Sequence, residues 1–500
     1  MARLHRWMGV CLCLPFLVWF LSGFVLMYCE YPSVTEESRL EHLVPLERDA
    51  VRISPEVAAE RAGISEPTEV RLSSILSRPV YRFRSAHQIV VVYADSGDVF
   101  SGFQQSQARQ VGAAWVHERP EDAKLEIRQV QEDDQWTLPE HYRMYRPLWK
   151  ISWPSGEVTY VSDVTGEVVQ HTTRRSRLGA YFGAIPHWIY FTELRRRAAA
   201  WNRVVILLSG AGAATSWLGL MIGLWIYSPK KQHRCRGFPS HIPYSGQMRW
   251  HVILGLTFGL LTFTWVLSGM FSMDPIRWPE NAVEERIEKD LVGAKWNGND
   301  FVGVGSVLSQ LQTNSPVREL MLTYLGGKPV GIAITSPSET AILWKRSGVQ
   351  TLLDQRLLKS IVGDAARPFS IVESRLVARY EPYYFDPKNR LRLPALFLRL
   401  NDPEQSILYL DLYTGRVARS YSRWDRLDRW LYEGLHDFDI PWLYRHRPLW
   451  DIFVIFGLSG GVWLSTTGII IAWRRVRLLT SPSLDKPPSV APVDSEVPLT

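Results

Sequence analysis

Residues 249–269 read RWHVILGLTFGLLTFTWVLSG, an apolar run that opens on one histidine, His251. Residues 3–23 read RLHRWMGVCLCLPFLVWFLSG and place His5 the same sixteen residues before a Leu-Ser-Gly sequence. The chain is 46% hydrophobic and 21% charged, and its mean hydropathy is only -0.09, so its apolar residues must be concentrated in a few segments. These two runs therefore indicate membrane spans of one recurring design.

Four apolar runs contain no Asp, Glu, Lys or Arg: residues 7–28, 204–227, 252–273 and 452–473. Each is longer than the ~20 residues that cross the hydrocarbon core of a bilayer. We interpret them as four transmembrane helices. A cleaved signal peptide is the alternative for the first run, but that run is too long and no small-x-small cleavage site follows it.

The orientation follows from the basic residues beside the spans. Arg3 and Arg6 precede the first span, five basic and no acidic residues lie between residues 228 and 250, and RRVR follows the fourth span. The positive-inside rule puts these segments in the cytoplasm. We therefore expect the two long segments, 31–185 and 275–435, in a bacterial periplasm. The net charge of +7 reflects these loops and arginine-rich stems, and we expect no nucleic-acid partner.

The chain repeats itself. At an offset of 246 the matching pairs of the first and third spans are His5/His251, Gly9/Gly255, Trp19/Trp265, Ser22/Ser268 and Gly23/Gly269. At an offset of 249 the pairs before the second and fourth spans include Gly166/Gly415, Arg177/Arg426, His187/His436 and Trp201/Trp450. A duplication with both halves inserted in the same sense predicts a pseudo-two-fold axis along the membrane normal, which puts matching residues at equal depth.

The segments outside the spans look like small α+β modules. Ser54-Pro55 is a helix-start signature, and the turns DSGDV, DVTGEV and DLYTGRV place a glycine where a hairpin needs positive φ. The predicted fold class is a membrane protein with an α-helical four-span bundle, built from two tandem repeats, and two periplasmic α+β domains. The predicted divisions are span 1 at 1–30, domain 1 at 31–185, span 2 with its approach at 186–228, a basic cytoplasmic loop at 229–249, span 3 at 250–274, domain 2 at 275–435, span 4 with its approach at 436–478, and a disordered cytoplasmic tail at 479–500.

Four of the twelve histidines recur between the halves. His5 and His251 lie at the cytoplasmic ends of equivalent spans, and His187 and His436 lie just outside the second and fourth spans. A two-fold axis would bring each pair face to face, and two opposed imidazoles can supply both axial ligands of a haem. A lone histidine at a membrane boundary is usually an interfacial residue, so the pairing carries this hypothesis.

Other metal groups fit the sequence less well. Zinc needs three or four converging ligands, and no C-x-x-C-H motif for covalent haem attachment occurs. We therefore predict b-type haem, with two haems per chain. Arg195, Arg197 and Arg203 are candidate contacts for haem propionates, with a solvated basic stem as the alternative. Because no dinucleotide-binding motif follows a strand, the electrons must come from a membrane quinol or a reductase partner.

The quoted runs, together with LHDFDIPWLYRHRPLWDIFVIFGLSGGVWLSTTGIIIAWRR at 435–475, resemble PepSY-associated transmembrane proteins. The family includes inner-membrane ferric-siderophore reductases with two b-type haems. The resemblance implies that His5, His251 and His436 are axial ligands, whereas His187, in IPHW, departs from the family's Leu-His pattern.

These features predict a bacterial inner-membrane protein that passes electrons to ferric iron, held by a siderophore, in the periplasm. The catalytic residues are unknown. The alternative is a membrane-anchored module that binds a protein or peptide partner without catalysis. A transporter is disfavoured, since no span contains a charged residue or a visible break.

Overall fold

The structure is a computed structural model of the chain. It describes residues 1–116, 125–230, 233–235, 238–276, 278–279, 281–301, 303–305, 308, 316–336, 339–344 and 348–480. The predicted tail lies outside these residues from position 481 onward, as do positions 231, 232, 236 and 237 of the basic loop. The described chain forms two compact units. Unit 1 comprises residues 1–20, 211–263 and 457–480, and unit 2 comprises residues 21–210 and 264–456.

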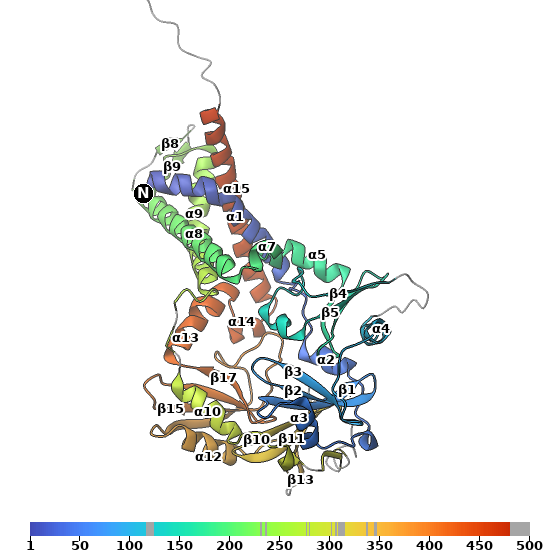
Figure 1. Cartoon of the computed structure of the whole chain (residues 1–500). Helices are drawn as coiled ribbons and strands as arrows, with labels where there is room; N and C mark the ends of the chain where they lie inside the picture. The colour runs from blue at the N-terminus through green and yellow to red at the C-terminus, as the bar shows by residue number, and fades with distance from the viewer. Residues whose placement is uncertain are drawn as a thin grey trace, which may run out of the picture. The chain divides into compact units, whose positions relative to one another are not determined.

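Four helices among the described residues are long and apolar enough to cross a membrane (Figure 1). They are α1 (Ala2–Leu26), α8 (Ala198–Ile226), α9 (Gly246–Phe271) and α15 (Leu449–Thr480). At most 39% of the residues in the apolar window of any of these helices are buried. The four helices have the length and composition of the four predicted spans.

Small residues let the helices of unit 1 approach one another closely. A Cβ atom at Gly460 would overlap the ring of Phe258, and a Cβ atom at Gly461 would overlap the ring of Phe20. Both aromatic rings therefore occupy space on α15 that only glycine leaves open. Between α8 and α9 the described chain also forms a short hairpin of β8 (His233–Cys235) and β9 (Phe238–Ser240).

The largest sheet of unit 2 is shared between the two halves of the chain. Its order is β13-β12-β11-β10-β1-β2-β3, with every neighbouring pair antiparallel. The strands are β1 (Glu69–Ile75), β2 (Arg78–Arg84), β3 (Ile89–Tyr93), β10 (Glu319–Leu325), β11 (Lys328–Ser336), β12 (Glu339–Trp344) and β13 (Gly348–Gln350). The sequence predicts a separate module in each half, whereas the structure joins them through the β1–β10 ladder.

Each half also contributes a four-stranded antiparallel sheet. The first is formed by β4 (Glu126–Val130), β5 (Leu148–Ser152), β6 (Val158–Ser162) and β7 (Val168–Thr172). The second is formed by β14 (Ile371–Val377), β15 (Ala395–Leu400), β16 (Ile407–Asp411) and β17 (Val417–Tyr421). The register shifts after Tyr160 in the first sheet and after Tyr409 in the second, positions 249 apart. The two sheets therefore have a register shift at matching positions, at the same offset of 249 residues as the sequence repeat.

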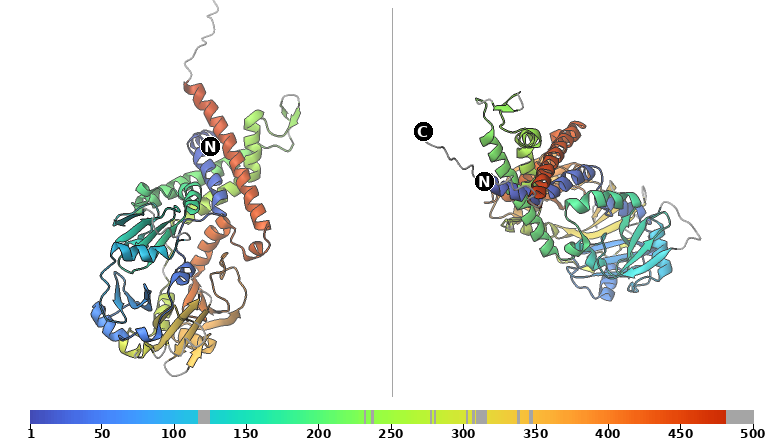
Figure 2. Two further views of the ribbon diagram at one scale, coloured as in Figure 1. Left: turned by 90° about the vertical axis from the view of Figure 1, so that its right-hand side faces the viewer. Right: turned by 90° about the horizontal axis from the view of Figure 1, so that it is seen from above.

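Helices separate the sheets of unit 2. In the first half α3 (Pro55–Ala62) and α4 (Gln105–Ala113) pack on the strands, and in the second half α10 (Ala282–Val292) and α12 (Gln355–Ala365) do so. Ile287 of α10 and Leu358 of α12 share one core with strands of both neighbouring sheets. Figure 2 shows these elements in two further orientations. One face of each four-stranded sheet thus packs on these helices, and the opposite face of the β4–β7 sheet packs against Ala180 and Ile185.

Short helices lead into and out of these sheets. Those of the first half are α2 (Glu36–His42), η1 (Arg48–Ala50), η2 (Glu140–Tyr145), α5 (Arg174–Phe182), α6 (Ala184–His187) and α7 (Thr192–Arg195). Those of the second half are η3 (Gly298–Phe301), α13 (Arg423–Arg429), η4 (Trp430–Asp437) and α14 (Pro441–Arg445). The predicted helix start is confirmed, because the Ser54 hydroxyl accepts the Val57 N–H and Pro55 is the first residue of α3. The turn glycines Gly97, Gly166 and Gly415 all have φ between 68° and 80°.

A buried ion network crosses the junction of the two halves. Glu319, at the start of β10, is 1% exposed. Its carboxylate lies 2.8 Å from Arg39 Nη2 and 3.2 Å from Arg71 Nη1, both in the first half. Burial is the largest single effect on the pKa of both guanidinium groups, and it lowers the pKa. The nearby carboxylates together outweigh burial and raise the pKa above its ordinary value. The shared sheet is therefore held by charge pairs that water does not screen.

Candidate functional site

The four recurring histidines form two pairs in the structure, one in each unit. The ring centroids of His5 and His251 are 6.4 Å apart in unit 1. The ring centroids of His187 and His436 are 6.0 Å apart in unit 2. His5 comes from α1, His251 from α9, His187 from α6 and His436 from η4. The pairing predicted from the repeat is therefore the pairing in the structure.

Each imidazole of the unit 1 pair is fixed through its Nδ1 atom. His5 Nδ1 lies 3.0 Å from the carbonyl oxygen of Thr215 on α8, and this oxygen can only accept a hydrogen bond. His251 Nδ1 lies 3.0 Å from Thr467 Oγ1 on α15. Because the Thr467 hydroxyl donates its own proton to the Leu464 carbonyl oxygen at 2.8 Å, it accepts from His251. Both rings therefore carry the Nδ1 proton and present an Nε2 lone pair.

The unit 2 pair has the same arrangement with serine hydroxyls. Ser268 of α9 lies 3.1 Å from His436 Nδ1 and donates to the Trp265 carbonyl oxygen at 2.9 Å. The His436 Nδ1 atom must then carry the proton in this contact. On the opposite ring, Ser22 Oγ lies 3.1 Å from His187 Nδ1. Ser22 and Ser268 are the serines of the two Leu-Ser-Gly sequences. The repeat therefore supplies a matching serine to His187 and to His436.

Local backbone structure places each histidine of the unit 2 pair. His436 lies in η4, a π-helix, which is a rare conformation that is frequent at functional sites. The Trp265 indole N–H donates to the His436 carbonyl oxygen at 3.0 Å and fixes this segment on α9. His187 ends the four-residue helix α6, which follows a break in the helix at Gly183. A Cβ atom at Gly183 would lie 2.9 Å from the Gly179 carbonyl oxygen, so the break requires glycine.

Glycines make room for two of the four imidazoles. A Cβ atom would lie 2.6 Å from His5 at Gly219 and 3.3 Å from His436 at Gly269, whereas one at Gly468 would lie at an ordinary 3.7 Å from His251. Gly219 belongs to the GLMIG sequence, which reads as a helix-packing motif, and the structure shows that it faces His5. A Cβ atom at Gly9 would meet no atom within 4 Å, and one at Gly255 would meet only Leu464 at 4.0 Å. Space therefore remains one turn beyond His5 and His251.

The dimensions of both pairs fit a haem held by two axial imidazoles. With a metal–nitrogen bond of about 2.0 Å and a nitrogen roughly 1.1 Å from its ring centroid, two rings on opposite sides of one metal have centroids about 6 Å apart. The measured separations of 6.4 and 6.0 Å match this value. Among the described residues, no group of three or more His, Cys, Asp and Glu side chains could hold a metal ion. A zinc-type site is therefore not formed by these residues.

The three arginines named as propionate contacts have different surroundings. The Arg195 guanidinium lies 5.1 Å from the ring centroid of Tyr190 and 4.6 Å from that of Trp201. Its buried Nε atom has no hydrogen-bond partner. Arg203 donates to the carbonyl oxygen of Ala199 in its own helix at 3.2 Å, and Arg197 is exposed. The propionate contacts therefore stay a prediction, and the buried Arg195 Nε retains a free donor for an anion.

A carboxylate three residues from His436 has an altered acidity. Asp439 has a 13% exposed side chain, and burial raises its pKa to about 7 although Arg429 opposes the shift. The Arg429 guanidinium donates to the Asp439 carbonyl oxygen at 2.6 Å. The pKa of the Asp439 carboxyl group therefore lies close to neutral pH, and the charge on this segment depends on the pH of the medium.

The model of the PepSY-associated TM region family matches residues 2–319. The chain belongs to this family. The match includes α1, α8 and α9 with His5, His187 and His251, whereas His436 lies beyond it. No curated protein matches the chain. Together with the four apolar helices, membership of the PepSY-associated TM region family establishes a membrane protein.

Proposed function

We propose that the chain is a b-type haem protein of the bacterial inner membrane that moves electrons across the bilayer and reduces ferric iron, held by a siderophore, in the periplasm. The observation that carries this proposal is the pairing of four histidines at centroid distances of 6.4 and 6.0 Å. His5 and His251 would hold one haem, and His187 and His436 would hold a second. A bound haem supplies one-electron chemistry at its iron.

The protein's own residues set the properties of each site. Hydrogen bonds at Nδ1 fix the ring orientation and raise the basicity of each Nε2 atom, which strengthens its bond to a metal. The basic segments beside α1, α8 and α15 support cytoplasmic termini, with the long segments 31–185 and 275–435 in the periplasm. The β-bulges 249 residues apart support a duplication of the chain. The electron donor would be a quinol or a reductase partner.

Ferric iron suits a one-electron reductase as substrate. Fe³⁺ is a hard cation that oxygen-rich chelators hold strongly, and they hold Fe²⁺ far more weakly. Transfer of one electron to the chelate therefore converts Fe³⁺ to Fe²⁺ and releases the metal. The chain's contribution is to bring the chelate near the unit 2 histidine pair and to keep the electron route out of bulk water.

Purified protein tests this function directly. The pyridine-haemochrome assay should give two non-covalent haems per chain, and dithionite should produce a reduced b-type spectrum. Adding a ferric siderophore to the reduced protein should reoxidise it, with formation of Fe²⁺ followed by a ferrous-specific chelator. A full-length protein without haem would favour the alternative of a membrane-anchored binding module.

A Gly219→Ala substitution should disturb only one of the two sites. The new Cβ atom would lie 2.6 Å from His5 Cε1, so the imidazole must move away from its place opposite His251. We expect loss of one haem per chain in the haemochrome assay. Gly259→Ala is the matched control, since its Cβ atom would meet Leu220 at an ordinary 3.5 Å. If Gly219→Ala kept both haems, the assignment of His5 as a haem ligand would be wrong.

A further inference from the structure

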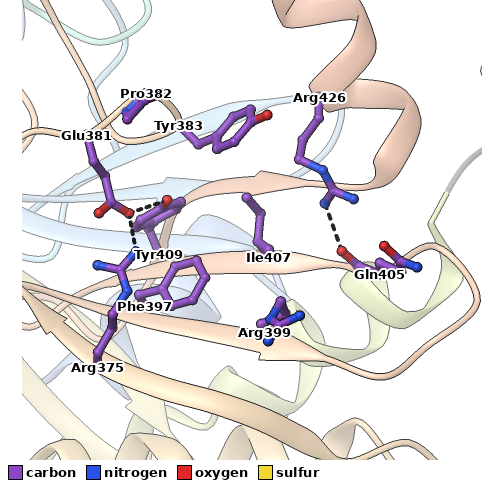
Figure 3. Close-up of a pocket in the computed structure, with 10 residues that line it drawn as sticks. All are labelled: Arg375, Glu381, Pro382, Tyr383, Phe397, Arg399, Gln405, Ile407, Tyr409 and Arg426. Atoms are coloured by element: carbon purple, nitrogen blue, oxygen red, sulfur yellow. Dashed lines mark hydrogen bonds and ion pairs between the residues drawn. The ribbon is translucent and has the colours of Figure 1, made fainter. Parts of the chain in front are cut away.

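Unit 2 contains a cleft on the face of the β14–β17 sheet that is turned away from α12. Its volume is about 350 Å³, and its lining includes Arg375, Arg399, Arg426, Glu381, Tyr383 and Tyr409. Glu381 is the one acidic residue among the ten described residues that line it. Figure 3 shows Arg375 and Arg399 rising from the strands, with Tyr383 and Arg426 opposite them. Small-molecule sites commonly have this size.

The floor of the cleft is rigid and aromatic. Phe397 is 6% exposed and Tyr409 is 1% exposed. The Tyr409 hydroxyl donates to Glu381 Oε1 at 2.6 Å, and Arg375 Nη2 lies 2.7 Å from the same oxygen. The Arg375 guanidinium also lies 4.2 Å from the ring centroid of Phe397. These contacts fix the direction of the Arg375 side chain, which is nevertheless 41% exposed.

Three arginines and one carboxylate line the cleft, and Glu373 lies beside it. Arg399 is 50% exposed, and its Nε and Nη2 atoms both lie 3.1 Å from one oxygen of Glu373, whereas Arg375 Nε lies 3.5 Å from the other oxygen. The Nη1 atom of Arg399 therefore keeps its donors for a ligand. Arg426 has a structural contact, because it donates to the Gln405 carbonyl oxygen at 2.8 Å, and the corresponding Arg177 donates to the Gly156 carbonyl oxygen at 2.7 Å. Arg375 and Arg399 are the cations that an incoming ligand would meet.

The corresponding face of the β4–β7 sheet is closed. Tyr160, 249 residues before Tyr409, donates to Asp134 at 2.7 Å, and Lys150, the counterpart of Arg399, lies 2.7 Å from the same carboxylate. One cation is thus balanced by one anion there. Trp136 packs over this face in a core with Tyr160. Where the first half has Val130 opposite Leu148, the second half has Arg375 opposite Phe397. The open face and the additional cation are specific to the second half.

The cleft is connected to the unit 2 histidine pair by one helical segment. The indole N–H of Trp430 donates to the hydroxyl of Tyr383, a lining residue, at 3.1 Å. Trp430 is the first residue of the π-helix η4, and His436 is the next to last. The two are six residues apart, which corresponds to a rise of at most about 9 Å along the helix axis. Tyr432 lies between them, with its ring centroid 5.7 Å from that of His436. A ligand in the cleft is therefore close to the proposed electron source.

We propose that this cleft binds the ferric chelate, and that it selects anionic chelates with carboxylate or catecholate oxygens over cationic hydroxamate chelates. This inference rests on the proposed function for the identity of the metal. Arg375 and Arg399 donate charge-assisted hydrogen bonds to the chelate oxygens, because a guanidinium fork matches paired anionic oxygens. The half-buried ring of Tyr383, which lines the cleft, packs against the organic part of the ligand.

A redox-inert ligand separates binding from electron transfer. Full-length protein in lipid nanodiscs is titrated with the gallium(III) tris-catecholate trianion, and binding is followed by tryptophan fluorescence. Arg399→Gln should weaken binding about tenfold or more, the effect of losing one charge-assisted contact. Arg367→Gln is the matched control, since Arg367 is 77% exposed and lies outside the cleft. The cationic gallium(III) complex of desferrioxamine should bind more weakly, and Arg399→Gln should leave its affinity unchanged.

The outcomes of this titration are distinct from those of the haem assay. If wild-type protein and Arg399→Gln bound the trianion with equal affinity and unfolded at the same temperature, the proposed binding of the chelate in the cleft would be overturned, even with haem content and iron reduction intact. Equal affinity of wild-type protein for the trianion and the cation would overturn the selectivity. Arg399-dependent binding of the trianion to a protein without haem would support the cleft as the binding site and would reject the proposed function.

Discussion

Under the proposed assignment of two haems, a His251→Ala variant is expected to contain one b-type haem per chain instead of two. The ring centroids of His251 and His5 are 6.4 Å apart, so loss of either imidazole would remove a ligand from the same proposed site. His5→Ala should therefore give the same haem content, and the double variant should lose nothing further. His187→Ala and His436→Ala should each remove the other haem. Pyridine-haemochrome absorbance per mole of protein measures each value.

Two controls make the haem result specific. His446→Ala removes an exposed histidine of the second half that bonds only the Trp442 carbonyl oxygen in the structure, and it should keep both haems. Thermal unfolding of each variant identifies a protein that has lost its fold rather than one ligand. If the double variant of His5 and His251 lost both haems while its unfolding was unchanged, the assignment of two independent pairs would be wrong.

A Glu319→Gln variant is expected to be about 1–3 kcal/mol less stable than the unaltered protein, the cost of losing charge-assisted contacts of a buried group. Glu319 is 1% exposed, and glutamine would leave Arg39 paired with Glu36 and Glu167, and Arg71 paired with Glu69. The β1–β10 ladder, which joins the halves, should open first. Chemical unfolding of the full-length protein in detergent, followed by tyrosine and tryptophan fluorescence, measures the change.

Glu66→Gln is the matched control for this variant. Glu66 of the first half pairs with Lys295 of the second half at 2.5 Å, but the two side chains are 63% and 83% exposed. Water and salt screen such a pair, so its loss should cost at most about 1 kcal/mol. An equal, small effect of both substitutions would mean that the buried network does not hold the two halves together.

The histidine pairs could be predicted because a repeat converts single residues into pairs. His5 and His251 share an offset of 246, and His187 and His436 share one of 249. Ser22 and Ser268 recur in the same alignment, so a hydroxyl near each histidine was also within reach of the sequence. Thr215 and Thr467 carried no such signal, because one contributes a backbone carbonyl and the other has no counterpart in the repeat.

The cleft on the β14–β17 sheet could not be predicted in the same way. Arg375, Glu381 and Arg399 lie on two strands and a loop, and only strand pairing brings them to one face. Their sequence neighbours are ordinary strand residues. Likewise, the sequence predicted sheets in each half, but it contained no sign that β1 would pair with β10.

The amino-acid sequence by itself determined the four membrane spans, the repeat and the identity of the paired histidines, because these follow from local hydrophobicity and from one offset along the chain. Only the tertiary structure decided which nitrogen of His5, His251 and His436 carries the hydrogen bond, that the two halves share one sheet, and that one sheet face is closed while the other is open. Those properties depend on contacts between residues that are far apart in the chain, and no local pattern encodes such contacts.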